Sequence, residues 1–431
     1  MSDVKDTAMK SFSHTWTKQD YLLALLAVLI NIGDGVEVFL PGVITQTVSC
    51  ELGLSDFQEG ILAVIMFLFW AIATMISVPI SEKLGDRFTM LLSLYLSIFF
   101  AILCAAVPNY YTLLLSRALI GICVGLNFST VGISLAKLHS SKEVHTQSCF
   151  LSTFGFAVGG TWVSLLGWMI LDIVNWRVFV LLTSIPLFVP PIIILHIFLN
   201  EKPDKVEEGD NEAVVEICTV PTEADGLVEK MPQNIPNSNY HIRVFKASLF
   251  LFCSLCSGFG CIILVPWLMR SYKKDLVRDT ENGNCEEVVQ GNDFLILAAV
   301  TGATNLVGRP LGYFLWSRVK FVTLQFTITA TMALSYGFVL AKPGIVASVI
   351  LLGMAKLCYS IQSTETRILL YDRDYYGSSG FELGSAVTLT SGVIGAVVGT
   401  SLAAFLDYFA AILATLVIVC VELVVICVLR R

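Results

Sequence analysis

Residues 200–240 read NEKPDKVEEGDNEAVVEICTVPTEADGLVEKMPQNIPNSNY and interrupt an otherwise apolar chain. The stretch is rich in Glu, Asp, Pro and Asn, a composition that favours a flexible linker and cannot cross a membrane. Six long apolar stretches precede it and six follow. Since about 20 apolar residues suffice to cross a hydrocarbon core of about 30 Å, each stretch predicts a membrane-spanning helix. The sequence therefore predicts an all-α membrane protein with twelve transmembrane helices in two six-helix halves.

The expected spans set the organisation of the chain. They cover residues 21–47, 57–80, 89–107, 110–136, 146–171 and 177–199 before the linker, and 245–269, 293–316, 321–341, 344–370, 381–406 and 409–429 after it. The expected parts are an N-terminal tail (1–20), an N-terminal half (21–199), a linker (200–242) and a C-terminal half (243–429). Two such halves are expected to enclose a site near the middle of the bilayer.

Composition excludes several classes of function. Hydrophobic residues make up 55% of the chain and charged residues 14%, too apolar for a soluble protein, so the lipid bilayer is the expected surrounding. The net charge of -7 lies mostly outside the spans, and we expect no nucleic-acid partner. The polar residues 1–18 do not resemble a cleaved leader. No catalytic triad, metal-ligand spacing or phosphate loop is present, so we expect no enzyme activity, no metal and no cofactor.

Basic residues indicate the orientation. Lys and Arg gather on the side that holds both termini and the linker, and Arg367 is counted there, so both termini are expected in the cytosol. The compartment stays open between the plasma membrane and an intracellular vesicle. Cys50 and Cys285 lie in loops that this topology places outside the cytosol, where a disulfide between them and two free thiols are both consistent with the sequence.

Charged residues within the expected spans are candidate functional residues, because each costs about 2.5–3.5 kcal/mol at the centre of a membrane helix. Asp34 and Glu37 are spaced i, i+3 and share one helix face. Arg117 begins a stretch with glycines at 121 and 125, and Lys356 lies at a comparable depth in the second half. The acidic residues are candidates for binding a proton or a cationic group, and the basic ones for steering an anionic group. A structural ion pair, such as Arg117 with Glu37, explains the same charges equally well.

Aromatic residues on the same spans offer a surface for stacking on a flat or cationic ligand, although packing and contact with lipid are alternative roles. They are Phe67, Phe69, Trp70, Phe154, Phe156, Phe259 and Tyr359.

Several motifs resemble the major facilitator superfamily, and within it the branch of synaptic vesicle glycoproteins and organic cation and anion transporters. Residues 84–87 (LGDR) resemble the core of the loop after the second span, and residues 155–160 the glycine motif of the fifth span. Residues 33–37 (GDGVE), followed by Cys50-Glu51 and later by Trp176-Arg177, are similar to that branch. The loop motif departs from the family pattern at Glu82, Thr89 and Met90, and only Asp372, Gly380 and Gly384 match the signature before span 11.

The resemblance implies a secondary transporter that moves a small organic ion or zwitterion by alternating access. Two halves of one chain suffice for alternating access, so we expect a monomer. Amines, carnitine-like zwitterions and nicotinate-like acids are the substrates that the resemblance implies. From the acidic residues in the first span we expect a proton to be coupled through Asp34 or Glu37. Thr390 falls where relatives carry the charge that separates cation from anion transporters, so the sign of the substrate stays open. The resemblance places Asp86, Arg87, Gly155, Gly159 and Asp372 in the conformational change. The rival reading is a transport-inactive vesicle-like protein that binds ligands or partners.

Overall fold

The computed structural model describes residues 16–139, 141–171, 173–200, 240–277, 298–316, 318–341, 344–377 and 380–429, and every element among them is helical. Cys285 lies outside the described residues. The elements of the first half are α2 (Lys18–Leu52), α3 (Asp56–Leu84), α4 (Asp86–Ala106), α5 (Tyr110–Leu138), α6 (Lys142–Ile170) and α7 (Trp176–Asn200). Those of the second half are α9 (Tyr240–Val277), η3 (Ala298–Ala303), α11 (Thr304–Trp316), α12 (Phe321–Leu340), α13 (Ile345–Leu370), α14 (Arg373–Tyr376), α15 (Phe381–Phe405) and α16 (Tyr408–Leu429).

Among the described residues, 11 helices are long and apolar enough to cross a membrane. The expected span over 293–316 is described only from residue 298, as the π-helical turn η3 followed by α11. Together these elements agree with six spans on each side of the linker. Helix ends extend beyond the apolar stretches because local capping fixes them. For α2, Thr17 and Asp20 form a capping box at the start, and Gly53, with φ of 64°, ends the helix.

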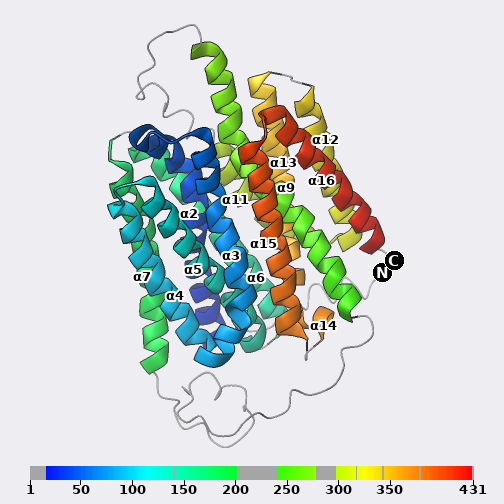
Figure 1. The fold of residues 1–431 in the computed structure, drawn as a ribbon. Coiled ribbons are helices and arrows are strands. Elements are labelled where there is room, and N and C mark those ends of the chain that lie inside the picture. Colours follow the sequence, from blue (N-terminus) through cyan, green and yellow to red (C-terminus); the bar gives the residue numbers. More distant parts are fainter. Residues whose placement is uncertain are drawn as a thin grey trace, which may run out of the picture.

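The two halves lie side by side as two bundles, the first coloured blue to green and the second green to red in Figure 1. Each half uses the same pairing, since its first helix packs against its fifth, α2 against α6 and α9 against α15. Across the halves, α3 packs against α15 and α6 against α11. We call the end where α7 finishes and α9 begins the linker end, which is the lower end in Figure 1, and the other the opposite end.

Glycines allow α2 and α6 to approach closely beside the two acidic residues. A Cβ atom on Gly159 would meet the carbonyl oxygen of Ile32, and one on Gly35 would meet that of Phe156. Both obstacles are backbone atoms, which cannot rotate away. The α2–α6 crossing therefore fixes where the segment with Asp34 and Glu37 lies.

Replacing Gly159 with leucine is expected to lower the free energy of unfolding by about 1–3 kcal/mol, because the side chain would push α2 away from α6. Thermal unfolding of the purified protein measures the effect. The matched control is Gly42→Leu, also within α2, where an added Cβ meets nothing within 4 Å. Equal losses in the two variants would contradict the close crossing.

Candidate functional site

A cavity lies between the two halves, with about 540 Å³ of empty space that includes its opening to the solvent. Helices α3, α5 and α6 form one wall, and α9, α11, α13 and α15 form the other. The lining residues are Trp70, Phe128, Thr153, Phe156, Leu251, Leu255, Phe259, Arg309, Tyr359, Ser363, Thr366, Arg367, Leu370 and Leu389. A site shared by both halves has the position expected of a pocket that opens alternately to the two sides of a membrane.

Aromatic rings cover much of the cavity surface. Trp70 contacts Phe128 and Phe259 with ring centroids 5.3 and 6.2 Å apart, and Phe128 contacts Phe156 at 6.1 Å. Phe259 also contacts Tyr359 at 6.2 Å. These contacts are edge-on, so the cavity presents ring faces and edges from both halves to whatever enters it.

Two arginines supply the charge of the cavity. Arg309 comes from α11 and Arg367 from α13, and the two are only 5% and 6% exposed. The Arg367 guanidinium lies 3.9 Å from the ring centroid of Phe128, and that of Arg309 lies 5.7 Å from the ring of Phe156. Among the described residues, no carboxylate lies within ion-pair distance of either side chain, and Nε of Arg309 and Nη2 of Arg367 have no hydrogen-bond partner. Within the part of the chain that the structure describes, these two buried positive charges thus have no carboxylate at ion-pair distance.

Asp34 is the acidic group that faces this charge from the first half. Its side chain is fully buried, and Asn127 donates to Oδ1 across 3.4 Å, whereas Oδ2 has no partner among the described residues. The Asp34 carboxyl interacts electrostatically with the Arg367 guanidinium, beyond ion-pair distance. A carboxyl on α2 and an arginine on α13 are therefore coupled across the two halves.

Glu37 and Arg117 form a buried ion pair instead. Arg117 Nη1 lies 3.0 Å from Glu37 Oε2, and the two side chains are 1% and 0% exposed. Lys356 lies apart from this pair, where it donates to the carbonyl of Gly258 across 3.3 Å and sits 4.5 Å from the ring centroid of Tyr359. Lys356 also lies 5.9 Å from the ring centroid of Phe39 on α2 of the first half. The four predicted charges thus comprise an ion pair, an acid that interacts with Arg367, and a lysine of α13 surrounded by groups from both halves.

Of the other predicted binding residues, some line the cavity and others do not. Phe259 and Tyr359 line the cavity. Phe154 packs against Phe150 with centroids 6.1 Å apart and is not among the lining residues. Thr390 is buried in α15, where its neighbour Leu389 reaches the cavity.

Of the predicted conformational residues, Asp86, Arg87 and Asp372 lie at the linker end, where ion pairs connect the two halves. Asp86, at the start of α4 beside Arg87, lies 3.4 Å from Lys137, which also lies 2.9 Å from Glu382 of α15. Asp372 lies 3.4 Å from Lys142. These ion pairs close the linker end between the halves. Gly155, like Gly159, lies at the α2–α6 crossing.

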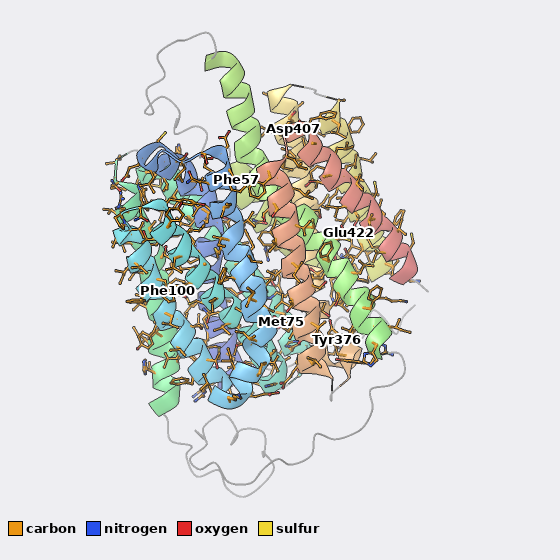
Figure 2. All side chains as sticks on the ribbon, viewed as in Figure 1. Phe57, Met75, Phe100, Tyr376, Asp407 and Glu422 are labelled. Atoms are coloured by element: carbon orange, nitrogen blue, oxygen red, sulfur yellow. The ribbon has the colours of Figure 1, made fainter. Side chains whose placement is uncertain are left out.

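The hydroxyl of Tyr371 adds a hydrogen bond across the same end, to the carbonyl of Phe128 over 3.1 Å. Tyr376 marks this end in Figure 2 and Phe57 marks the other. At the opposite end the halves meet through Phe57 and Phe405, whose ring centroids are 5.5 Å apart. The cavity thus lies between two sets of contacts.

Two motifs that are far apart in sequence meet at the opposite end. Glu51 accepts a hydrogen bond from Nε1 of Trp176 across 2.5 Å and another from Arg177. Arg177 also donates to the carbonyl of Val107 across 3.2 Å. Burial raises the pKa of Glu51, but the hydrogen bonds from Arg177 and Trp176 outweigh it and hold the pKa below its usual value.

This lowered pKa predicts a loss of stability in acid. Because Glu51 binds its proton less readily in the folded chain, its contribution is complete above the unfolded pKa, about 4.3, and is lost as pH falls through the folded value. The melting temperature should therefore drop more steeply below about pH 4.3 in the parent than in Glu51→Gln. Thermal melts between neutral and acidic pH test this, and identical slopes would contradict it.

The family follows from comparison with known proteins. The family model described as Major Facilitator Superfamily matches residues 23–364, most of the chain. The chain belongs to the major facilitator superfamily. As a member of it, the protein is a multi-pass membrane protein, and its halves correspond to the two bundles of that fold.

Curated relatives of this superfamily member cover less of the chain. Synaptic vesicle glycoprotein 2A of Rattus norvegicus is 27% identical over 198 residues, which is 42% of this chain and 26% of that protein. Synaptic vesicle glycoprotein 2B of the same species is 26% identical over 179 residues (38% and 26%), and the putative transporter svop-1 of Caenorhabditis elegans is 23% identical over 166 (38% and 31%). The aligned part thus spans about a quarter to a third of these relatives.

Four buried charged residues were not predicted from the sequence as candidate functional residues. Arg367 is expected at the cytosolic edge from sequence, but it lies in the cavity wall. Arg309, Glu365 and Glu422 also lie within apolar stretches. The rule that singled out Asp34, a charge inside an expected span, applies to all four and is the signal that finds them.

Proposed function

We propose that this protein is a secondary active transporter of a small organic anion, with a carboxylate and a flat apolar body, that works by alternating access and is coupled to protons. Of the candidate classes, amines, carnitine-like zwitterions and nicotinate-like acids, the nicotinate-like acids fit this description. The linker end, which holds most of the basic residues, is proposed to face the cytosol.

The proposal rests on the two buried arginines in an aromatic cavity, which have no carboxylate at ion-pair distance among the residues that the structure describes. A buried charge costs several kcal/mol unless it is paired, so a bound anion would lower the free energy of this site. A guanidinium binds a carboxylate through two parallel hydrogen bonds, while the aromatic walls accept a flat ring. An amine would instead meet two like charges, which disfavours cationic substrates.

Asp34 is the proposed proton carrier. When ionised, its carboxylate attracts Arg367 across the halves and competes with an incoming anion. When a proton neutralises Asp34, Arg367 is available to the substrate carboxylate. Binding of proton and anion would then favour each other, as symport requires. Glu37 suits this role less, because Arg117 already neutralises it.

Alternating access would use the two sets of contacts between the halves. Opening toward the linker side would break the ion pairs of Lys137 and Lys142 with Glu382 and Asp372. Opening toward the other side would separate Phe57 from Phe405.

Uptake into proteoliposomes tests the substrate class. Purified protein is reconstituted without a gradient and offered aromatic monocarboxylates, amines, zwitterions and sugars at equal concentration. Saturable uptake of the carboxylates supports the proposal. The control is Arg177→Gln, which replaces an arginine outside the cavity and should retain this uptake. Uptake of amines in preference to carboxylates would refute it.

A second candidate function is ligand binding without transport. The chain departs from the family's loop motif at Glu82 and Thr89, and the two vesicle glycoproteins named above are among its relatives. Saturable carboxylate binding with no uptake of any class in the same panel would favour this candidate.

A further inference from the structure

The second half contains two buried pairs of a carboxyl and a carboxamide, away from the cavity. Gln325 Nε2 on α12 donates to Glu365 Oε2 on α13 across 2.6 Å. Gln362 Nε2 on α13 donates to Glu422 Oε1 on α16, also across 2.6 Å. Figure 2 labels Glu422 within α16. All four side chains are fully buried and none lines the cavity.

Each pair lacks one hydrogen-bond donor. Oε1 of Gln325 and Oε1 of Glu365 have no partner among the described residues, and the same holds for Oε1 of Gln362 and Oε2 of Glu422. The orphan atoms are therefore all acceptors, one on the carboxyl and one on the amide of each pair. A carboxylic acid has an O–H that can donate to an amide oxygen while its other oxygen accepts from the amide N–H. One proton per pair would supply the missing donor.

No basic side chain among the residues that the structure describes lies within ion-pair distance of these carboxyls. Among the described residues, neither Glu365 nor Glu422 forms an ion pair, whereas the equally buried Glu37 has Arg117. The titratable groups that interact with Glu422 are Cys253 and Cys256 of α9 and Tyr359 of α13, all neutral at ordinary pH. For Glu365 the described residues supply only Gln325. An ionised carboxylate here would be an unpaired buried charge, which costs several kcal/mol.

We propose that Glu365 and Glu422 are two proton-binding sites, at which the neutral carboxylic acids donate to the amide oxygens of Gln325 and Gln362. In this state each pair has two hydrogen bonds in place of one. Since α13 takes part in both pairs, the two bound protons hold α12, α13 and α16 together. The sites lie outside the cavity, so the proposal does not depend on the substrate. Loss of the proton from Glu365 or Glu422 would therefore alter the packing of α13, the helix that also carries Arg367.

Infrared difference spectroscopy of the reconstituted full chain tests this directly. The parent is expected to absorb at neutral pH in the region of protonated carboxylic acids, with a shift on exchange into heavy water. Glu365→Gln and Glu422→Gln should each remove part of that absorption, and the double variant should remove the sum. The control Glu51→Gln, which replaces an ionised carboxylate, should leave the absorption unchanged. An unchanged spectrum in both buried variants would overturn the proposal.

Melting temperatures distinguish a proton bound at Glu365 and Glu422 from a metal cation bound at the same carboxyls. Glutamine mimics the shape of a neutral acid, so the two variants should melt close to the parent, and replacing sodium or potassium with choline should not change the parent's melting temperature. A melting temperature that rises with sodium or potassium in the parent, and not in Glu365→Gln or Glu422→Gln, would show ionised carboxylates that hold a metal cation and would overturn the proposal. If a variant does not fold, Gln325→Met and Gln362→Met replace it. In these variants the acid absorption should persist with a shifted frequency, and its disappearance would also contradict the assignment.

Discussion

Replacing Arg367 or Arg309 with glutamine is expected to weaken the binding of an aromatic monocarboxylate by about 30-fold to several-thousand-fold. Truncating one partner of a buried, hydrogen-bonded charge pair costs about 2–5 kcal/mol, and each 1.4 kcal/mol is a factor of ten in Kd. Arg367 should show the larger effect, because it also faces Asp34. Calorimetric titration of the purified protein with the carboxylate that is best taken up measures both losses.

The same two substitutions are expected to leave the thermal stability of the ligand-free protein unchanged or to raise it. Without a bound anion, neither guanidinium group has a carboxylate at ion-pair distance among the described residues, so glutamine at either position removes a poorly compensated buried charge. Thermal unfolding of the ligand-free variants is therefore expected at or above the temperature of the parent. Arg367→Lys retains the charge but not the two-pronged hydrogen bonding, and should bind with intermediate affinity. Variants that unfold more easily and yet bind normally would contradict the assignment of these arginines to a ligand.

Replacing Arg117 with methionine is expected to destabilise the protein by about 3–5 kcal/mol, the largest stability change we predict. Arg117 and Glu37 are almost completely buried and 3.0 Å apart, so the substitution leaves an unpaired carboxylate inside the first half. The measurement is the free energy of unfolding in detergent from denaturant titration.

The double variant Arg117→Met with Glu37→Gln provides the matched control. It removes both charges, so it should recover most of the lost stability, and the non-additivity of the two changes gives the coupling energy of the pair. A double variant that is less stable than Arg117→Met alone would contradict the inference that Arg117 and Glu37 neutralise each other.

The sequence predicts the fold well because the bilayer imposes a strong constraint. Each span needs a long apolar stretch, and the polar residues 200–240 separate two sets of six. It also predicts that Asp34 and Glu37 share a face, since helical spacing is local. In the structure, Glu37 pairs with Arg117, whereas Asp34 interacts with Arg367. This difference depends on which helices pack together, which cannot be predicted from residue spacing within one helix.

The cavity is harder to predict for the same reason. Phe259 and Tyr359 are named from sequence, whereas Arg309 and Arg367 are not, although each lies in an apolar stretch. Arg367 is near the end of α13, where a basic residue ordinarily marks the cytosolic edge of a span. Only the packing of α13 against the first half brings it into the wall of the cavity. The pairing of Glu51 with Trp176 and Arg177 likewise joins motifs that are recognisable separately.

Uptake driven by a proton gradient tests whether carboxylate transport is coupled to protons through Asp34. Proteoliposomes are given an outside pH lower than the inside pH, and accumulation of the aromatic monocarboxylate is followed with and without a protonophore, in the parent and in Asp34→Asn. We predict that the parent accumulates the carboxylate only while the gradient lasts, and that Asp34→Asn exchanges it across the membrane without responding to the gradient. Uptake by the parent that ignores the gradient, or a response that survives in Asp34→Asn, would contradict proton-coupled transport through this site.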